Sequence, residues 1–262
     1  MPAVPSDIFI YVAAGLFGAT IGSFLNVCIY RLPRNESLVW PSSRCPACGS
    51  RIAPYDNVPI LSFFWLRGRC RACRGPISPR YPLVESANAF GYVWIVQQFG
   101  LDWSAAAYAS LFSALLVVTV IDFDHQIIPD RITLPGIPLG ILCAATVLPT
   151  GLLNSMLGVL LGGGLLWFMA WISPYLFGKE GMGGGDIKLL AMVGAFLGWE
   201  PVLLTVLVGA SAGAAIGLSL IALKRFRRDQ YLPFGPFLAL GAVVAMFFFS
   251  EIKSWYVGFL AP

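Results

Sequence analysis

Long apolar runs separated by short polar breaks dominate this chain. A helix that crosses the ~30 Å hydrocarbon core of a bilayer needs ~20 mostly apolar residues. Eight apolar runs can be distinguished, at residues 8–30, 83–99, 105–121, 132–148, 153–177, 187–199, 202–223 and 234–249. The pattern predicts an all-α polytopic membrane protein with about eight transmembrane helices. Glycines at every third or fourth position, as at 15, 18 and 22, favour close packing between helices.

One polar segment interrupts this pattern. Residues 31–82 contain nine arginines, eight prolines and four cysteines, far too polar a composition for lipid. We therefore expect a small soluble domain between the first two spans. The predicted organisation is a first transmembrane helix at 1–30, a soluble domain at 31–82 and a seven-helix membrane core at 83–262.

The run at 187–199 is shorter than a membrane span. Thirteen residues of helix extend only ~20 Å at 1.5 Å per residue, which is too little to cross the hydrocarbon core unaided. Asp186 directly precedes this run. We expect Asp186 to lie below the headgroups, in a thinned or water-filled part of the membrane domain.

Composition and charge fix the class of protein and its expected orientation. The chain has 262 residues, of which 58% are apolar and only 11% charged, with a net charge of +4. Cytoplasmic loops of membrane proteins are enriched in Lys and Arg. Basic residues fill 31–82 and recur at Arg131, Lys179, Lys188, Lys224, Arg225, Arg227 and Arg228, whereas the alternate connections carry Asp7, Asp102 and Glu200, with Lys253 near the C-terminus.

This distribution predicts that both termini lie outside and that the polar segment lies in the cytosol. The first apolar run has no basic stretch before it, so we interpret it as a retained helix and not a cleaved signal. The basic cluster at 224–228 is interpreted as a topology anchor beside anionic membrane lipid, and no nucleic-acid partner is expected.

Four cysteines in the polar segment have the spacing of a metal site. Cys45 and Cys48 form one C-x2-C pair, and Cys70 and Cys73 form a second pair after twenty-one residues. This spacing predicts a tetrahedral Zn²⁺ site with four thiolate ligands, which leaves no open position and is therefore structural. Four free thiols are the alternative, since a cytosolic location disfavours disulfides. The remaining cysteines, Cys28 and Cys143, fall in apolar runs and are interpreted as core residues.

Two acids are expected at the same depth of the membrane domain. Asp122 ends the third span and Asp186 begins the sixth, both on the cytosolic side. Paired carboxylates in a low-dielectric site share a proton, so that one acts as a general base and the other as an acid, as in aspartic proteases. His125 is the only histidine, which excludes a zinc hydrolase site with several His ligands and argues against a Ser-His-Asp triad. The alternative for Asp122, with Asp124 and Asp130, is a solvated acidic loop.

A glycine-rich stretch surrounds the second acid. Residues 181–188 read GMGGGDIK. Glycine lets the backbone approach a partner closely, so this loop can admit a second peptide backbone beside Asp186, with Gly183, Gly185 and Lys188 binding substrate or supporting the site. The alternative is a flexible loop that ends in a helix-capping Asp. A phosphate-binding loop fits less well, because no Ser or Thr follows Lys188 and no strand precedes it.

The motifs together resemble those of the bacterial type IV prepilin peptidases, membrane aspartic proteases with a GxGD motif. The resemblance covers nearly the whole chain. It rests on GSFLNVCIYRLPR at 22–34, the two C-x2-C pairs, YDNVPILS at 55–62, LRGRCRAC at 66–73, ISPRYPLVE at 77–85, IDFDHQIIPD at 121–130 and GMGGGDIK at 181–188.

The resemblance implies a specific activity. The family's catalytic pair maps onto Asp122 and Asp186. Its members cleave the leader peptide of type IV prepilins or type II secretion pseudopilins at the cytoplasmic face of the bacterial inner membrane. They then methylate the new N-terminal amine with S-adenosylmethionine. The long cysteine segment, which short peptidase-only relatives lack, favours the bifunctional form.

The sequence gives no standard fold for the methyl donor. It has no dinucleotide-type glycine fingerprint and no alternation of strands and helices. We therefore expect S-adenosylmethionine to bind the cysteine domain and the adjoining first loop, packed beside the two catalytic acids. The acids available there are Glu36, Asp56 and, at the membrane boundary, Glu85.

Three other functions remain open: a peptidase without methyltransferase activity, a proton-coupled transporter that uses intramembrane acids as a relay, and a noncatalytic assembly scaffold. A transporter is expected to contain an internal repeat with paired broken helices, but GMGGGDIK has no counterpart elsewhere in the chain. A scaffold gives no reason for two acids at one membrane depth.

Overall fold

The computed structural model describes residues 5–177, 182–223 and 232–260 of the chain. This part is helical, and its only β-type pairings are two isolated bridges. The chain divides into two compact units, residues 1–117 and 118–262, with the boundary inside helix α4 (Trp103–His125). The lysine at 179 and the basic cluster at 224–228 lie outside the described residues.

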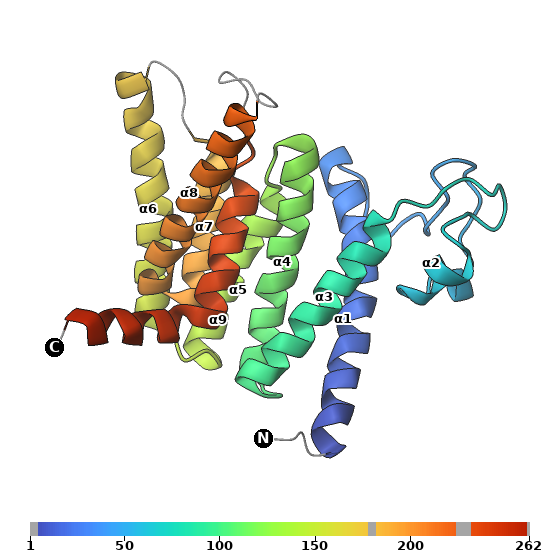
Figure 1. Ribbon diagram of the computed structural model, residues 1–262, viewed down its shortest axis with the longest axis horizontal. Coiled ribbons are helices and arrows are strands. Elements are labelled where there is room, and N and C mark those ends of the chain that lie inside the picture. The colour runs from blue at the N-terminus through green and yellow to red at the C-terminus, as the bar shows by residue number, and fades with distance from the viewer. Residues whose placement is uncertain (1–4, 178–181, 224–231, 261–262) are drawn as a thin grey trace. The chain divides into compact units, whose positions relative to one another are not determined.

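Each predicted apolar run coincides with a helix (Figure 1). Besides α4, these are α1 (Pro5–Arg31), α3 (Arg80–Phe99), α5 (Asp130–Thr146), α6 (Leu152–Phe177), α7 (Gly184–Leu197), α8 (Trp199–Ala222) and α9 (Gly235–Leu260). Among the described residues, α1, α4, α6, α8 and α9 are long and apolar enough to cross a membrane. The all-helical fold is thus confirmed for the described residues, five of whose helices could span a membrane, and the full set of eight spans stays a prediction.

Close contact between α1 and α3 organises the first unit (Figure 1). A Cβ placed at Gly18 would lie 2.9 Å from the Cα atom of Ala89, and one at Gly22 would lie 2.7 Å from the Cα atom of Glu85. The small residues predicted to favour packing therefore lie in the contact. Asn88, which is fully buried, adds a polar link by donating a hydrogen bond to the Gly18 carbonyl oxygen at 2.8 Å.

The polar segment joins α1 to α3 with little regular structure. It contains two short 3₁₀ turns, Leu32–Arg34 and Pro54–Asp56, and one short helix, α2 (Leu61–Trp65). No residue from 33 to 81 is buried. A segment of this length without a core needs another source of stability.

The short helix α7 is the centre of the second unit. It contacts α5, α6, α8 and α9, and every residue from Leu189 to Leu197 is buried. Two glycines of α6 allow this contact, because a Cβ at Gly158 or Gly162 would lie 2.3 or 2.6 Å from a backbone oxygen of α7. The apolar residues of this 14-residue helix therefore have protein neighbours, which shows how so short a helix can be accommodated.

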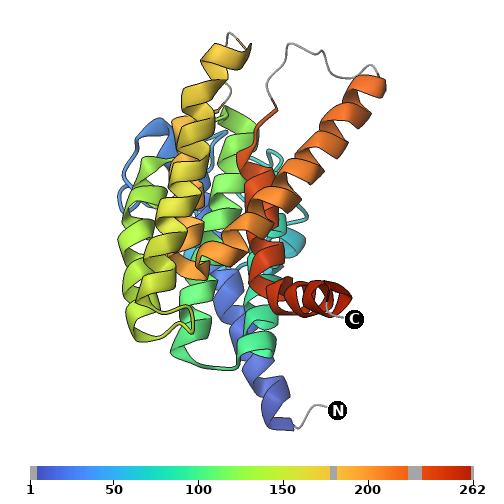
Figure 2. The ribbon, with the colours of Figure 1, turned by 90° about the vertical axis from the view of Figure 1, so that its left-hand side faces the viewer.

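Helix α9 continues beyond the predicted run, which ends at residue 249. Its last turns bend away from the direction of its first part (Figure 2). Lys253 in this extension forms an ion pair with Glu200 at the start of α8. These two residues were expected on the same side of the membrane, and their contact agrees with that expectation.

Candidate active site and metal site

Asp122 lies in the last turn of α4 and is only 5% exposed. Its Oδ2 atom accepts a hydrogen bond from the backbone N–H of Gly235 at 3.0 Å. Gly235 is the first residue of α9, and the partial positive charge at a helix N-terminus stabilises a nearby carboxylate. The protein therefore holds this carboxylate with a backbone donor at the start of a 26-residue helix.

Gly235 has no room for a side chain. A Cβ atom there would lie 2.7 Å from Oδ2 of Asp122 and 3.1 Å from Cδ1 of Ile128. Any larger residue would have to displace the carboxylate or its neighbour. Sequence reasoning missed this glycine, although its place in Pro-Phe-Gly-Pro at 233–236, directly before an apolar run, was a usable signal.

Asp186 lies in the first turn of α7, before the apolar part of that helix, and is half-buried. Burial, and then the negative charge of Asp122, raise the pKa of Asp186 to about 6. The two predicted acids are thus close enough to interact electrostatically. Asp124 and His125 at the end of α4 are exposed.

Gly185, in the glycine-rich stretch at 181–188, packs closely against Ile128. A Cβ at Gly185 would lie 2.8 Å from Cβ of Ile128, the same residue that approaches Gly235. Ile128 therefore lies against the starts of both α7 and α9. Gly183 is exposed, and a Cβ there would lie 3.4 Å from Oδ2 of Asp186.

Lys188 forms an ion pair with Asp130, between helices α7 and α5. Its Nζ atom lies 2.5 Å from Oδ1 of Asp130, the first residue of α5. Both side chains are partly exposed. The pair links the first turns of α5 and α7, so Lys188 has an internal partner beside the acids.

This arrangement can support acid-base chemistry. Asp122 is buried and accepts a fixed backbone donor, and Asp186 is half-buried in the same unit. Two carboxyl groups partly withdrawn from water can share one proton between them. A base and an acid side by side can activate a water molecule and protonate a carbonyl oxygen in one reaction.

The four cysteines lie in two backbone turns that have the same hydrogen-bond pattern. The Cys45 amide donates to the Ser50 carbonyl oxygen at 2.9 Å, and the Cys70 amide donates to that of Gly75 at 2.8 Å. The fourth residue after the first cysteine of each turn has a positive φ, 71° at Gly49 and 59° at Arg74. Each turn therefore presents its pair of thiols from the same backbone geometry.

The thiols fit a tetrahedral metal ion. All four sulfur atoms lie within 4.8 Å of one another, and those of Cys45 and Cys73 are 3.9 Å apart. Zinc–sulfur bonds of ~2.3 Å in a tetrahedron place the sulfur atoms ~3.8 Å apart. The sulfur of Cys48 also lies 2.6 Å from the Ser50 hydroxyl oxygen, a hydrogen bond that fixes this thiol within the cluster.

Comparison with known proteins identifies the family. The bacterial peptidase A24 N-terminal domain matches residues 16–99, and the type IV leader peptidase family matches residues 109–218. A "prepilin leader peptidase/N-methyltransferase" of Pseudomonas aeruginosa is 36% identical over 93% of this chain and 92% of its own length. The chain belongs to this family.

Other relatives carry the same name. One from Aeromonas hydrophila is 37% identical over 92% of each chain, and one from Burkholderia pseudomallei is 38% identical over 89% of this chain and 84% of its own. No solved structure matches the chain significantly. Because the likeness covers nearly the full length, this protein is an enzyme of a family named for two activities, a peptidase and an N-methyltransferase.

Proposed function

We propose that this enzyme cleaves the leader peptide of type IV prepilins or type II secretion pseudopilins, with Asp122 and Asp186 as its catalytic pair. The proposal is supported by the packing of Ile128 against both Gly235, whose amide binds Asp122, and Gly185, which directly precedes Asp186. The family relationship supplies the substrate class.

The different surroundings of the two acids suggest separate roles. Asp122, held by the Gly235 amide, takes a proton from a water molecule, whose oxygen attacks the scissile carbonyl carbon. Asp186 gives its proton to the carbonyl oxygen as the tetrahedral intermediate forms. When the C–N bond breaks, Asp122 passes its proton to the leaving amine and Asp186 recovers its own from the hydroxyl of the intermediate. The carboxyl product and the free amine complete the proton balance.

We assign the methyltransferase activity to the first unit, which contains the soluble domain. S-adenosylmethionine supplies an electrophilic methyl group for the amine released by cleavage. We place its binding in the soluble domain at 31–82, with Cys45, Cys48, Cys70 and Cys73 holding a structural Zn²⁺. The proposed division of the chain is a transmembrane helix at 1–30, the soluble domain at 31–82 and a membrane peptidase core at 83–262. Within that core, Gly183, Gly185 and Lys188 bind the substrate or support the catalytic acids.

The proposed location is the bacterial inner membrane, with the acids and the cysteine domain facing the cytoplasm and membrane lipid around the helices. A single cysteine at position 102 of a cysteine-depleted chain should react with an impermeant thiol reagent from outside the cell, and one at position 227 should not. The reverse labelling pattern would rule out cleavage at the cytoplasmic face.

Purified enzyme tests both activities. We expect it to cut a synthetic prepilin without the methyl donor, and to methylate the new N-terminus only when S-adenosylmethionine is added. Asp122→Asn should still methylate a pre-cleaved pilin, whereas changes within 36–85 that remove a cysteine ligand or a residue that binds the methyl donor should reduce that methylation. Equal loss in the two kinds of variant would contradict separate sites.

A further inference from the structure

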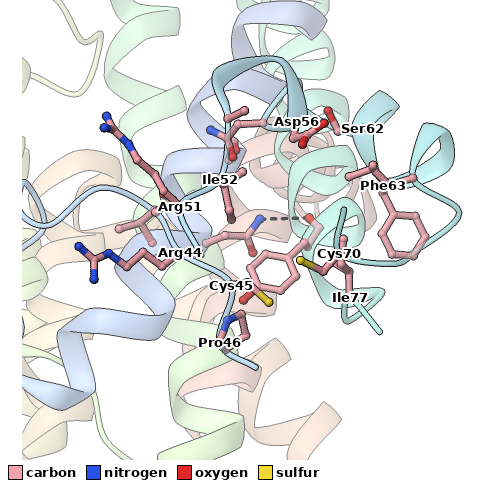
Figure 3. Close-up of a pocket in the computed structure, with 18 of the residues that line it drawn as sticks. Arg44, Cys45, Pro46, Arg51, Ile52, Asp56, Ser62, Phe63, Cys70 and Ile77 are labelled. Carbon is pink, nitrogen blue, oxygen red and sulfur yellow. Dashed lines mark hydrogen bonds between the residues drawn. The ribbon is translucent and has the colours of Figure 1, made fainter. Parts of the chain in front are cut away.

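The first unit contains a large cavity that the peptidase reaction does not use. It has a volume of about 850 Å³ and is lined by the end of α1, the polar segment and the first turns of α3. Ligand pockets typically have volumes of ~300–1,000 Å³. Figure 3 shows Cys45 and Cys70 on one side of this cavity and Asp56 and Ser62 at the other end.

Three acids line the cavity, together with four arginines, Arg31, Arg44, Arg51 and Arg71. Only one of the acids is both buried and without an ion-pair partner among the described residues. Asp56 is engaged by Arg71, whose Nε and an Nη atom donate to its two oxygens at 2.8 and 2.6 Å. Glu36 is exposed. Glu85 is only 7% exposed, and within the described chain no Lys or Arg forms an ion pair with it.

Glu85 is held rigidly by neutral donors. Its Oε2 atom accepts a hydrogen bond from the Ile60 amide at 2.7 Å, and the side chains of Ser23 and Asn26 are further donors to it. Its backbone is fixed against Gly22 of α1, where no Cβ fits. A carboxylate buried among neutral groups gains most from a ligand that brings a positive charge.

The partner of Glu85 is itself strained. Ile60 has φ 63° and ψ −54°, the geometry of a γ-turn, in which the Leu61 amide donates to the Pro59 carbonyl oxygen at 2.6 Å. A β-branched residue rarely adopts a positive φ. Such a conformation is costly and persists only where its surroundings impose it, which is common at ligand sites. Here the hydrogen bond to Glu85 is one such constraint, and Ile60 lines the cavity.

We propose that this cavity is the methyl-donor site and that Glu85 recognises the positive charge of S-adenosylmethionine. The inference rests on the proposed methyltransferase function and adds the residue that selects the ligand. S-adenosylmethionine carries a sulfonium and an ammonium group, so it is a cation at its reactive end. Three tyrosines also line the cavity, and aromatic rings attract cations. Tyr30 and Tyr55 already face the guanidinium groups of Arg34 and Arg71, so Tyr81 is the ring offered to a ligand.

Equilibrium dialysis of the purified full-length protein tests the proposal. Radiolabelled S-adenosylmethionine is compared with S-adenosylhomocysteine, which lacks the sulfonium charge. Wild-type protein should prefer the charged ligand by about tenfold, the difference expected for one charged contact of ~1.4 kcal/mol. Glu85→Gln keeps an oxygen for the Ile60 amide but removes the charge, so it should bind the two ligands about equally.

Glu36→Gln is the matched control, because it removes an exposed acid from the same cavity. It should keep the wild-type preference. Zinc content and prepilin cleavage, measured on each variant, establish that Glu85→Gln is folded, and Glu85→Asp provides a second variant that keeps the charge and should keep most of the preference. Unchanged binding and preference in folded Glu85→Gln would overturn the proposal. Absence of any binding to wild-type protein would instead overturn the methyltransferase function on which it rests.

Discussion

The two acids and the four cysteines are held in place by opposite means. Asp122 is buried at the end of a helix, and the glycine at the start of α9 admits its carboxylate without any spare room. The cysteines lie in a segment where no residue from 33 to 81 is buried, and each pair depends on a short backbone turn. Tight helix packing positions the acids, whereas local turns and a shared metal ion would position the thiols.

This contrast predicts different responses to damage. A packed site tolerates no added atom, because the surrounding helices cannot move apart cheaply. A segment without a core tolerates exchange of its surface residues but depends on its few cross-links. Substitutions in the two regions should therefore separate loss of catalysis from loss of folding.

The largest expected effect is removal of either acid. Asp122→Asn and Asp186→Asn should each lower prepilin cleavage by about 10²–10⁴-fold or more, because neither half of an acid-base pair works alone. Cleavage of a synthetic prepilin by purified protein is the measurement. Asp124→Asn and Asp130→Asn serve as controls and should be milder. If Asp124→Asn abolishes cleavage and Asp122→Asn spares it, the assignment within 122–130 is wrong.

Adding one carbon atom beside Asp122 should have the next largest effect. Gly235→Ala places a Cβ atom 2.7 Å from Oδ2 of Asp122, and small misplacement of a catalytic group can cost about 100-fold in rate. We expect kcat to fall by about 10- to 100-fold with little change in KM, because substrate binding is not altered. Steady-state kinetics provide the measurement.

The same helix contains a matched control for this change. A Cβ atom at Gly258, near the other end of α9, would meet nothing within 4 Å. Gly258→Ala should therefore retain cleavage within about twofold of wild type, since surface changes are usually nearly neutral. Similar kinetics for the two alanine variants would mean that Gly235 does not position Asp122.

Loss of one thiol should affect the cysteine segment more than the acids. Cys45→Ser should lower the zinc content from about one ion per chain, because a closed tetrahedral site needs four ligands. We expect methylation of pre-cleaved pilin to fall about tenfold or more, and prepilin cleavage to fall less. Metal analysis and the two assays test this, with Cys143→Ser as the control outside the cluster. Fully active protein that contains no zinc would reject the metal site.

The ion pair of Asp130 and Lys188 should have the smallest effect. Both side chains are partly exposed, 53% and 34%, and such pairs contribute about 0–1 kcal/mol. Lys188→Met should therefore reduce cleavage by no more than about fivefold. Exchange of the two charges, Asp130→Lys with Lys188→Asp, should restore part of the loss. A deficit as large as that of Asp186→Asn would give Lys188 a direct role in the reaction.

The sequence predicts the helices well because membrane burial demands long, uninterrupted apolar runs. Spacing likewise predicts the cluster of Cys45, Cys48, Cys70 and Cys73, since two such turns can share one ion. Each of these two features depends on a local pattern. The pairing of Asp122 with Asp186 is instead inferred from the alternation of the spans across the membrane, and it stays a prediction.

Contacts between distant segments could not be predicted in the same way. Nothing near Asp122 in the sequence indicates that its partner is the amide of Gly235, more than 100 residues away. Ile128 reads as one more apolar residue of a loop, yet it lies against two helix starts. The cavity around Glu85 depends on how the polar segment folds over the ends of α1 and α3, which no periodic pattern encodes.

The glycine contact between α1 and α3 has a further consequence for the cysteine segment. These helices carry the two ends of the segment, and a hydrogen bond from Asn26 to the Tyr81 carbonyl oxygen, 3.1 Å long, ties them together at its base. The entropy of closing this long loop is therefore lost when the two membrane helices associate, before the segment itself folds. Removal of the metal should open the segment locally while its ends stay joined. Because its two ends stay joined, the metal-free segment should refold readily when zinc is added back.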